Sequence, residues 1–229
     1  MKKQKEIDWI FFDVGGVITD DRESEELRKQ MDFDLLHDYD LSITREMVDD
    51  AFQKGSSFVG GTDDNLIKVI VKKEKDAERL IMEIRKRKNE LWPNMEVFAY
   101  RSPFTQGILD VVKKLSKYYR LGIIANQPHE TTRRLKEFEI SDYFENIGLS
   151  AVKGLHKPDV KFYELVLKEN NIDPKKSIMI DDNIERGLAP AKKLGMKTIW
   201  FDWGIRKDYP DWVDYKIQKS EDLLDIFIE

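Results

Sequence analysis

The chain has 229 residues and no cysteine, and its 39 Lys and Arg against 44 Asp and Glu give a net charge of -5. These values exclude a disulfide framework and a thiolate metal site, and they indicate no basic face for nucleic acid. No apolar run approaches the ~20 residues that cross a bilayer, and the charged start 1–6 does not resemble a signal peptide. We therefore expect a cytoplasmic protein with no membrane or nucleic-acid partner.

The first predicted strand is the apolar run 9–12, which ends at Asp13 and is followed at once by Gly15 and Gly16. Parallel strands that are covered on both faces have continuous apolar sequences, and ligands in open α/β sheets bind outside the carboxyl ends of the strands. An aspartate at a strand end is often only a turn or helix-cap residue. The accessible backbone beside Asp13 nevertheless favours a site of chemistry here.

The segment from about 21 to 92 has helical periodicity almost throughout. A dozen residues are enough to connect one strand to a parallel neighbour. More than a hundred residues separate Asp13 from Asn126, where a later apolar run ends, so a segment is inserted between them. Four blocks of apolar residues recur at helical spacing: Leu27, Met31, Leu35 and Leu36; Ile43, Met47, Val48, Ala51 and Phe52; Leu66, Ile67, Ile70 and Val71, after a possible N-cap at Thr62; and Leu80, Ile81, Ile84 and Leu91.

These blocks predict an all-helical cap inserted into a single α/β core. We place the cap at 20–93 and the core at 1–19 and 94–229. The hinges are expected near Thr19-Asp20 and near the prolines Pro93 and Pro103.

Helical and strand patterns alternate after the insertion, which predicts a Rossmann-like, doubly wound parallel sheet. Its polar strand ends are expected to converge on one crevice. The predicted order is helix 104–118, strand 121–125 ending at Asn126, helix 129–139, strand 147–150, a helix from Pro158 to about 170, strand 177–180 followed by Asp181 and Asp182, helix 184–194 ended by Gly195, and strand 198–201.

Four ordered motifs resemble those of the haloacid dehalogenase superfamily. They are Phe-Phe-Asp-Val-Gly-Gly-Val at 11–17, Ile-Ala-Asn at 124–126, His-Lys-Pro-Asp at 156–159 and Met-Ile-Asp-Asp-Asn at 179–183. The match spans essentially the whole chain, because the helical insertion falls where one branch of that family carries its helical cap. Each motif is weak alone, but four in this order at predicted strand ends are a strong signal.

The resemblance implies a phosphomonoester hydrolase that acts on a small phosphorylated metabolite through an aspartyl-phosphate intermediate. Asp13 would be the nucleophile, and Lys157 would supply a positive charge to the phosphate. Asn126 would donate its side-chain amide to a phosphate oxygen, with Gly15 and Gly16 also at the substrate. The plain alternative for Lys157 is an ordinary solvated lysine.

The same resemblance implies Mg²⁺ as the cofactor, because this ion prefers hard oxygen ligands. Asp13, Asp182 and the carbonyl of Gly15 would hold it. Asp181 would be a second carboxylate that either faces the Mg²⁺ or orients other groups.

Three positions depart from the family pattern. Gly15 stands where most phosphatases of the family have a general acid/base aspartate, and Ala125 stands where a Ser or Thr usually precedes the asparagine. The usual acid after the last motif is replaced by Arg186 and Gly187, although Glu185 is nearby. Proton supply to the leaving group is therefore unassigned.

Two rival functions stay open. In a 2-haloacid dehalogenase, Asp13 would attack carbon without a metal, but Gly15 disfavours that branch, which typically has tyrosine there. A non-catalytic descendant would only bind a phosphorylated ligand, as the losses at Gly15 and Ala125 allow. We expect the late aromatic residues, namely Trp200, Trp203, Trp212, Tyr209 and Tyr215, to serve in packing, and neither the substrate nor the oligomeric state follows from the sequence.

Overall fold

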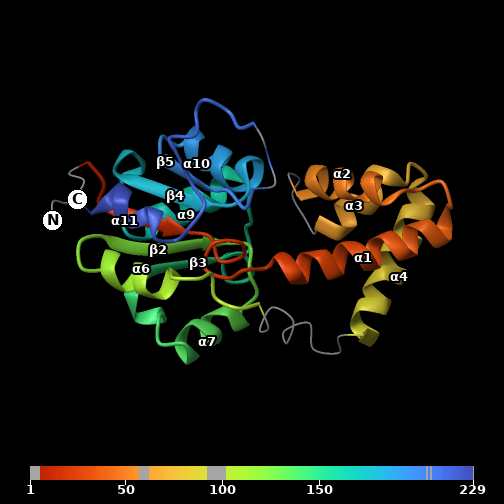
Figure 1. The fold of residues 1–229 in the computed structure, drawn as a ribbon, viewed down its shortest axis with the longest axis horizontal. Coiled ribbons are helices and arrows are strands. Elements are labelled where there is room, and N and C mark those ends of the chain that lie inside the picture. The colour runs from red at the N-terminus through yellow and green to blue at the C-terminus, as the bar shows by residue number, and fades with distance from the viewer. Residues whose placement is uncertain (1–5, 57–61, 92–101, 205, 207, 229) are drawn as a thin grey trace. The chain divides into compact units, whose positions relative to one another are not determined.

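A six-stranded parallel sheet forms the centre of the protein (Figure 1). The computed structural model describes residues 6–56, 62–91, 102–204, 206 and 208–228. The strand order is β3-β2-β1-β4-β5-β6, so the predicted doubly wound sheet is confirmed. The strands are β1 (Trp9–Phe12), β2 (Arg120–Ala125), β3 (Phe144–Leu149), β4 (Ser177–Asp181), β5 (Lys197–Phe201) and β6 (Tyr215–Ile217).

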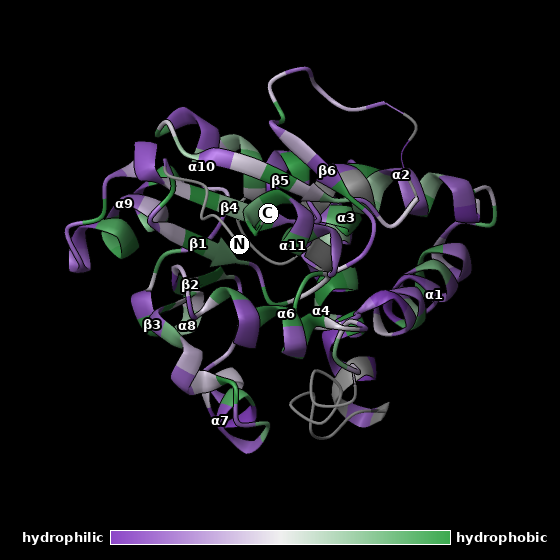
Figure 2. Ribbon diagram, turned by 60° about the vertical axis from the view of Figure 1, so that its left-hand side comes forward, coloured by the Kyte–Doolittle hydropathy of each residue, from purple (hydrophilic) through white to green (hydrophobic). Residues whose placement is uncertain are grey.

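Helices cover both faces of this sheet, and each face has its own hydrophobic core. Along β1, Ile10 and Phe12 belong to one core and Trp9 and Phe11 belong to the other. Figure 2 shows the hydrophobic colouring of these central strands. The helices here are α6 (Ile108–Leu115), α7 (Glu130–Glu137), α8 (Ser150–Lys153), α9 (Val160–Glu169), α10 (Ala189–Lys193) and α11 (Asp222–Phe227).

Two predicted helices begin later than expected. The helix predicted from residue 104 begins at Ile108, because Phe104 bridges to Thr19 and Gly107 has a positive φ of 76°. The helix predicted from Pro158 begins at Val160, because the side chain of Asp159 accepts a hydrogen bond from the Lys161 N–H and caps it.

Other elements differ from the prediction in extent or were not predicted. The predicted helix 184–194 is a π-helical turn, Ile184–Leu188, followed by α10. Pro190, which lacks an N–H, lies in the first turn of α10, where none is needed. β3 begins three residues before the predicted 147, and Ser150 already belongs to α8. β6 and α11 were not predicted.

Within its described residues, 21–56, 62–91 and 102, the inserted segment has four helices, as predicted. They are α1 (Arg22–Tyr39), α2 (Arg45–Ser56), α3 (Thr62–Ile70) and α4 (Glu74–Leu91). Most of the predicted apolar positions form their shared core, whereas Leu27 and Met47 are 45% and 44% exposed. α3 begins at Thr62, the residue predicted to cap it.

The chain divides into two compact units, residues 1–20 with 103–229, and residues 21–102. The predicted return to the core at 94 lies among residues 92–101, outside the described ranges. The assignment of core and cap as separate domains stays a prediction.

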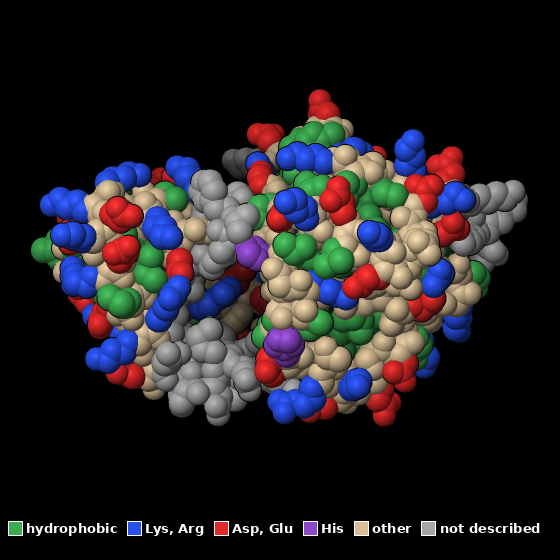
Figure 3. Space-filling view, turned by 180° about the vertical axis from the view of Figure 1, so that it is seen from behind, with side chains coloured by type: hydrophobic (Ala, Val, Ile, Leu, Met, Phe, Trp, Pro, Cys, Tyr) green, Lys and Arg blue, Asp and Glu red, His purple; other side chains and the backbone are tan. Residues whose placement is uncertain are grey.

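The described surface is mixed in charge. Figure 3 shows acidic and basic side chains interspersed over one face. Across the described ranges, no helix combines the length and the apolar character needed to cross a bilayer.

Candidate active site

Three carboxylates meet at the carboxyl ends of β1 and β4. The two strands are parallel neighbours, with Phe12 paired to Ile180, so the residues that follow them, Asp13 and Asp181, lie side by side. Oxygen atoms of Asp13, Asp181 and Asp182 all lie within 4.8 Å of one another. The convergence predicted from the strand ends is therefore present for these three residues.

Lys157 is buried among these carboxylates. Its Nζ lies 2.7 Å from Asp13 Oδ2 and 2.7 Å from Asp181 Oδ2. The residue is only 1% exposed, which rules out the reading of an ordinary solvated lysine. A buried ammonium is costly unless it is paired and hydrogen-bonded, and here both requirements are met.

Burial dominates the electrostatics of the cluster. It raises the pKa of Asp13 to about 6, against the opposing charge of Lys157, while the charge of Asp181 adds to the rise. Burial acts to lower the pKa of Lys157, but the two carboxylates outweigh it and the pKa is raised. With all groups ionised, three carboxylates and one ammonium leave a formal charge of -2. A divalent cation with a preference for oxygen ligands fits this donor set.

The two aspartates after β4 differ in their surroundings. Asp181 is fully buried; its Oδ2 pairs with Lys157 and its Oδ1 accepts a hydrogen bond from the Asn183 N–H at 2.8 Å. A Cβ at Gly187 would lie 2.0 Å from Asp181 Cγ, so glycine is required there. Asp182 is only partly buried. These contacts favour Asp181 as the orienting carboxylate, and the role of Asp182 as a metal ligand stays a prediction.

Gly16 lies directly against Asp182. Its φ is +74°, and a Cβ there would lie 2.2 Å from Asp182 Oδ2. Its N–H donates to the Thr19 carbonyl at 2.8 Å, and its carbonyl accepts from Trp203 Nε1 at 2.9 Å. Both backbone groups of Gly16 therefore hold the loop after β1 in place through hydrogen bonds, and the contact of Gly16 with substrate stays a prediction. The same holds for Gly15, whose carbonyl is a predicted metal ligand.

Asn126 binds the backbone of Lys157 through both ends of its amide. Asn126 Nδ2 donates to the Lys157 carbonyl at 2.9 Å, and Asn126 Oδ1 accepts from the Lys157 N–H at 2.7 Å. The residue therefore positions the lysine. Only the second hydrogen on Asn126 Nδ2 could make the predicted donation to a phosphate oxygen, and this donation stays a prediction.

Two late tryptophans, predicted to serve in packing alone, also hydrogen-bond the backbone of the site. Trp200 Nε1 donates to the Asp182 carbonyl at 3.0 Å, and Trp203 Nε1 donates to Gly16. Tyr163 was missed as well; its hydroxyl donates to the Gly187 carbonyl at 2.7 Å. A buried indole N–H or phenol needs a partner, and this requirement was the signal in the sequence.

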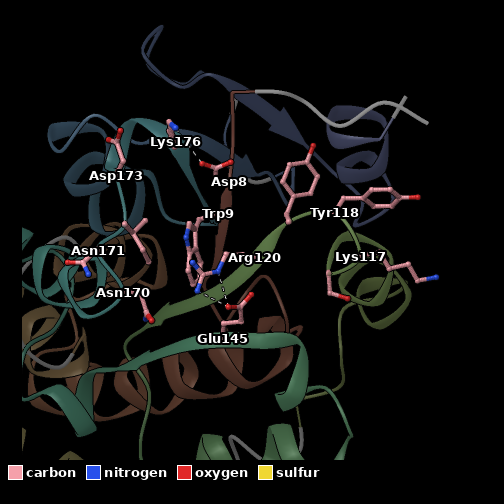
Figure 4. Close-up of a pocket in the computed structure, with 13 residues that line it drawn as sticks. Asp8, Trp9, Lys117, Tyr118, Arg120, Glu145, Asn170, Asn171, Asp173 and Lys176 are labelled. Atoms are coloured by element: carbon pink, nitrogen blue, oxygen red, sulfur yellow. Dashed lines mark hydrogen bonds and ion pairs between the residues drawn. The ribbon is translucent and has the colours of Figure 1, made fainter.

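A separate hollow of about 570 Å³ lies at the amino ends of the strands (Figure 4). Arg120 lines this hollow. Its Cζ lies 4.1 Å from the centre of the Trp9 ring, and its Nη2 lies 2.8 Å from Glu145 Oε2. Lys176 lies 3.8 Å from Asp8. These charges are paired with one another, and none of the carboxylates of the site lines the hollow.

Comparison with known proteins gives a consistent result. A family model described as haloacid dehalogenase-like hydrolase matches residues 10–201. A glyceraldehyde 3-phosphate phosphatase from Pyrococcus furiosus is 31% identical over 150 residues, which cover 60% of this chain and 62% of that protein. The aligned region thus spans about three fifths of that relative's length.

A second relative aligns over almost the whole chain. A glyceraldehyde 3-phosphate phosphatase from Methanocaldococcus jannaschii is 25% identical over 228 residues, 95% of each chain. Among solved structures, the haloacid dehalogenase-like family protein SP0104 from Streptococcus pneumoniae has a TM-score of 0.68 at 17% identity. It covers 97% of this chain and 99% of its own, and it has the same fold.

Proposed function

This chain belongs to the haloacid dehalogenase-like hydrolase family, and we propose that it is a Mg²⁺-dependent phosphomonoester hydrolase acting on a small phosphorylated metabolite. The observation that carries the proposal is the group of three carboxylates around the buried ammonium of Lys157. The names of the two phosphatase relatives support the substrate class.

Asp13 is the nucleophile of the proposed reaction. Its Oδ1 accepts a hydrogen bond from the Val14 N–H at 2.8 Å and its Oδ2 pairs with Lys157, so the carboxylate is held at the end of β1. A carboxylate oxygen attacks phosphorus, a phosphorus–oxygen bond to Asp13 forms, and the bond to the leaving oxygen breaks. Water then attacks phosphorus, breaks the bond to Asp13 and releases inorganic phosphate.

Asp13, Asp182 and the Gly15 carbonyl would hold the Mg²⁺. The ion would supply charge neutralisation, allowing a phosphate dianion to approach the carboxylate. Asp181 keeps the Lys157 ammonium in place, and Asn126 fixes the backbone of the same lysine. The position that usually carries the general acid is Gly15, so water protonates the leaving oxygen in this proposal.

The two rival functions predict different behaviour. A 2-haloacid dehalogenase needs no metal, and its substrate carboxylate would meet a cluster of formal charge -2. A non-catalytic descendant would bind phosphate without turnover. The phosphatase names of the relatives and the oxygen-rich cluster both favour ester hydrolysis over these alternatives.

The test is a screen of phosphate release from glyceraldehyde 3-phosphate and an aryl phosphate, with and without chelator, beside halide release from 2-chloropropionate. We expect metal-dependent phosphate release that Asp13→Asn abolishes. Asp202→Asn is the matched control, because Asp202 also follows a strand but pairs with Lys216 at 3.0 Å. Halide release in chelator would support the dehalogenase, and phosphate binding without turnover would support the non-catalytic reading.

A further inference from the structure

The proposed site lacks positive charge for its substrate. Its side chains carry a formal charge of -2, which one divalent cation brings to zero. A phosphate ester then adds up to two more negative charges in a largely buried place, where uncompensated charge is costly. A further cation is needed.

The residues expected to bind phosphate are already engaged. Lys157 Nζ contacts two carboxylates at 2.7 Å, and both ends of the Asn126 amide bind the Lys157 backbone. Ala125 has no hydroxyl to donate. The usual phosphate ligands therefore leave a deficit that another donor must fill.

The turn after Asp182 brings Arg186 to this place. Asn183 Oδ1 accepts a hydrogen bond from the Arg186 N–H at 2.8 Å, which fixes the start of the turn. The next residue, Gly187, packs against the Asp181 carboxylate, and its carbonyl accepts from Tyr163. The backbone on both sides of Arg186 is thus anchored beside the cluster.

The charge of Arg186 acts on the centre of the site. Burial has the largest effect on the pKa of Asp13, Lys157 and Tyr163, and the Arg186 charge contributes to all three. The Nε of Arg186 is itself buried. Glu185, in contrast, pairs at the surface with Arg206 Nη1 at 2.7 Å.

We propose that Arg186 is a ligand of the substrate phosphate and replaces the donor that Ala125 does not provide. This inference rests on the proposed function and deepens it. A guanidinium offers several N–H donors in a fixed plane, which suits two phosphate oxygens at once. An arginine where other family members carry an acid thus gives the site an anion-binding group.

The experiment measures the affinity for inorganic phosphate by calorimetry in the presence of Mg²⁺, and the KM for an aryl phosphate. Hydrogen bonds to charged groups predict that Arg186→Gln weakens phosphate binding by roughly 10- to 100-fold and raises KM similarly. Arg186→Lys should be intermediate. Glu185→Gln is the matched neighbour control and should equal the wild type. Melting temperature and Mg²⁺ affinity should stay unchanged in all three variants.

Several results would overturn the proposal. Phosphate binding of Arg186→Gln at wild-type strength is one, and no phosphate binding by the wild type is another. If Arg186→Gln also loses Mg²⁺ affinity and has a lower melting temperature, the role of Arg186 is structural instead. If wild type binds phosphate through Arg186 but hydrolyses no ester, the assignment of Arg186 stands and the proposed function fails.

Discussion

Gly16→Ala should lower both the stability of the fold and the affinity of the proposed metal site, and a matched control separates the two effects. Alanine at a φ of +74° costs about 1–2 kcal/mol, because its Cβ crowds the following carbonyl oxygen. The new Cβ would also lie 2.2 Å from Asp182 Oδ2, whereas ordinary contact begins at 3.4 Å. The carboxylate must therefore move by the difference of 1.2 Å or more.

This displacement is large for Asp182 in its proposed role as a Mg²⁺ ligand. Altering a group that orients a ligand typically costs about 10- to 100-fold in metal affinity, and we expect a loss of that order for Mg²⁺. The free energy of unfolding should fall by about 1–2 kcal/mol in chelator from the backbone term alone. Urea denaturation in chelator measures the stability, and calorimetric titration measures the affinity for Mg²⁺.

Gly195→Ala is the matched control. Gly195 also has a positive φ, +88°, but a Cβ there would meet only Lys175 Cγ at an ordinary 3.7 Å. It should lose similar stability and keep its Mg²⁺ affinity. The reasoning is refuted if Gly16→Ala binds Mg²⁺ like the wild type, or if Gly195→Ala loses affinity as well.

Three further outcomes are expected. Gly15→Asp should raise kcat/KM for an alkyl phosphate more than for an aryl phosphate, because a general acid contributes roughly 10²–10⁴-fold and matters most for poor leaving groups. Equal rates for both esters in the wild type and in Gly15→Asp would contradict this. Lys157→Met should lower the free energy of unfolding by about 3–5 kcal/mol at pH 7 in chelator. This loss of unfolding free energy should become smaller towards pH 4. Without Lys157 the already raised pKa of Asp13 rises further, so the folded variant binds a proton that the unfolded chain has lost. A loss that does not change with pH in urea denaturation would argue against this reasoning. Asp214→Ala should lower the free energy of unfolding by about 1–3 kcal/mol by the same method, because the N–H and the hydroxyl of the buried Thr198 both lose their acceptor, Asp214 Oδ2 at 2.9 Å. Asp211→Ala is the control and should have no measurable effect, because Asp211 is exposed.

The sheet and the carboxylate cluster were predictable because their signals are local. The run 9–12 is wholly apolar and ends at Asp13, and the run 177–180 ends at Asp181 in the same way. In a parallel sheet, two such ends must lie at one edge. Strand position therefore followed from the sequence, and so did the meeting of these side chains.

Partners that depend on tertiary contacts were not predictable. The amide of Asn126 finds its acceptor 31 residues away, at the Lys157 carbonyl, and no spacing rule encodes that pairing. β6 has three residues and only one of them, Ile217, is buried, so its periodicity is too short to detect. The close approach of Gly187 to the Asp181 carboxylate likewise exists only in the folded chain.

The position of β1 at the centre of the sheet also sets when the site can form during synthesis. Its two neighbours, β2 and β4, begin at residues 120 and 177, so the strand that carries Asp13 leaves the ribosome long before either partner exists. The helical unit 21–102 has its own buried core and is complete before β2 is made. Domains generally fold as units during translation, so we expect this unit to fold first. The carboxylate cluster cannot exist on a chain that ends before Asp182, and an incomplete chain therefore carries Asp13 without the two carboxylates that meet it in the folded protein.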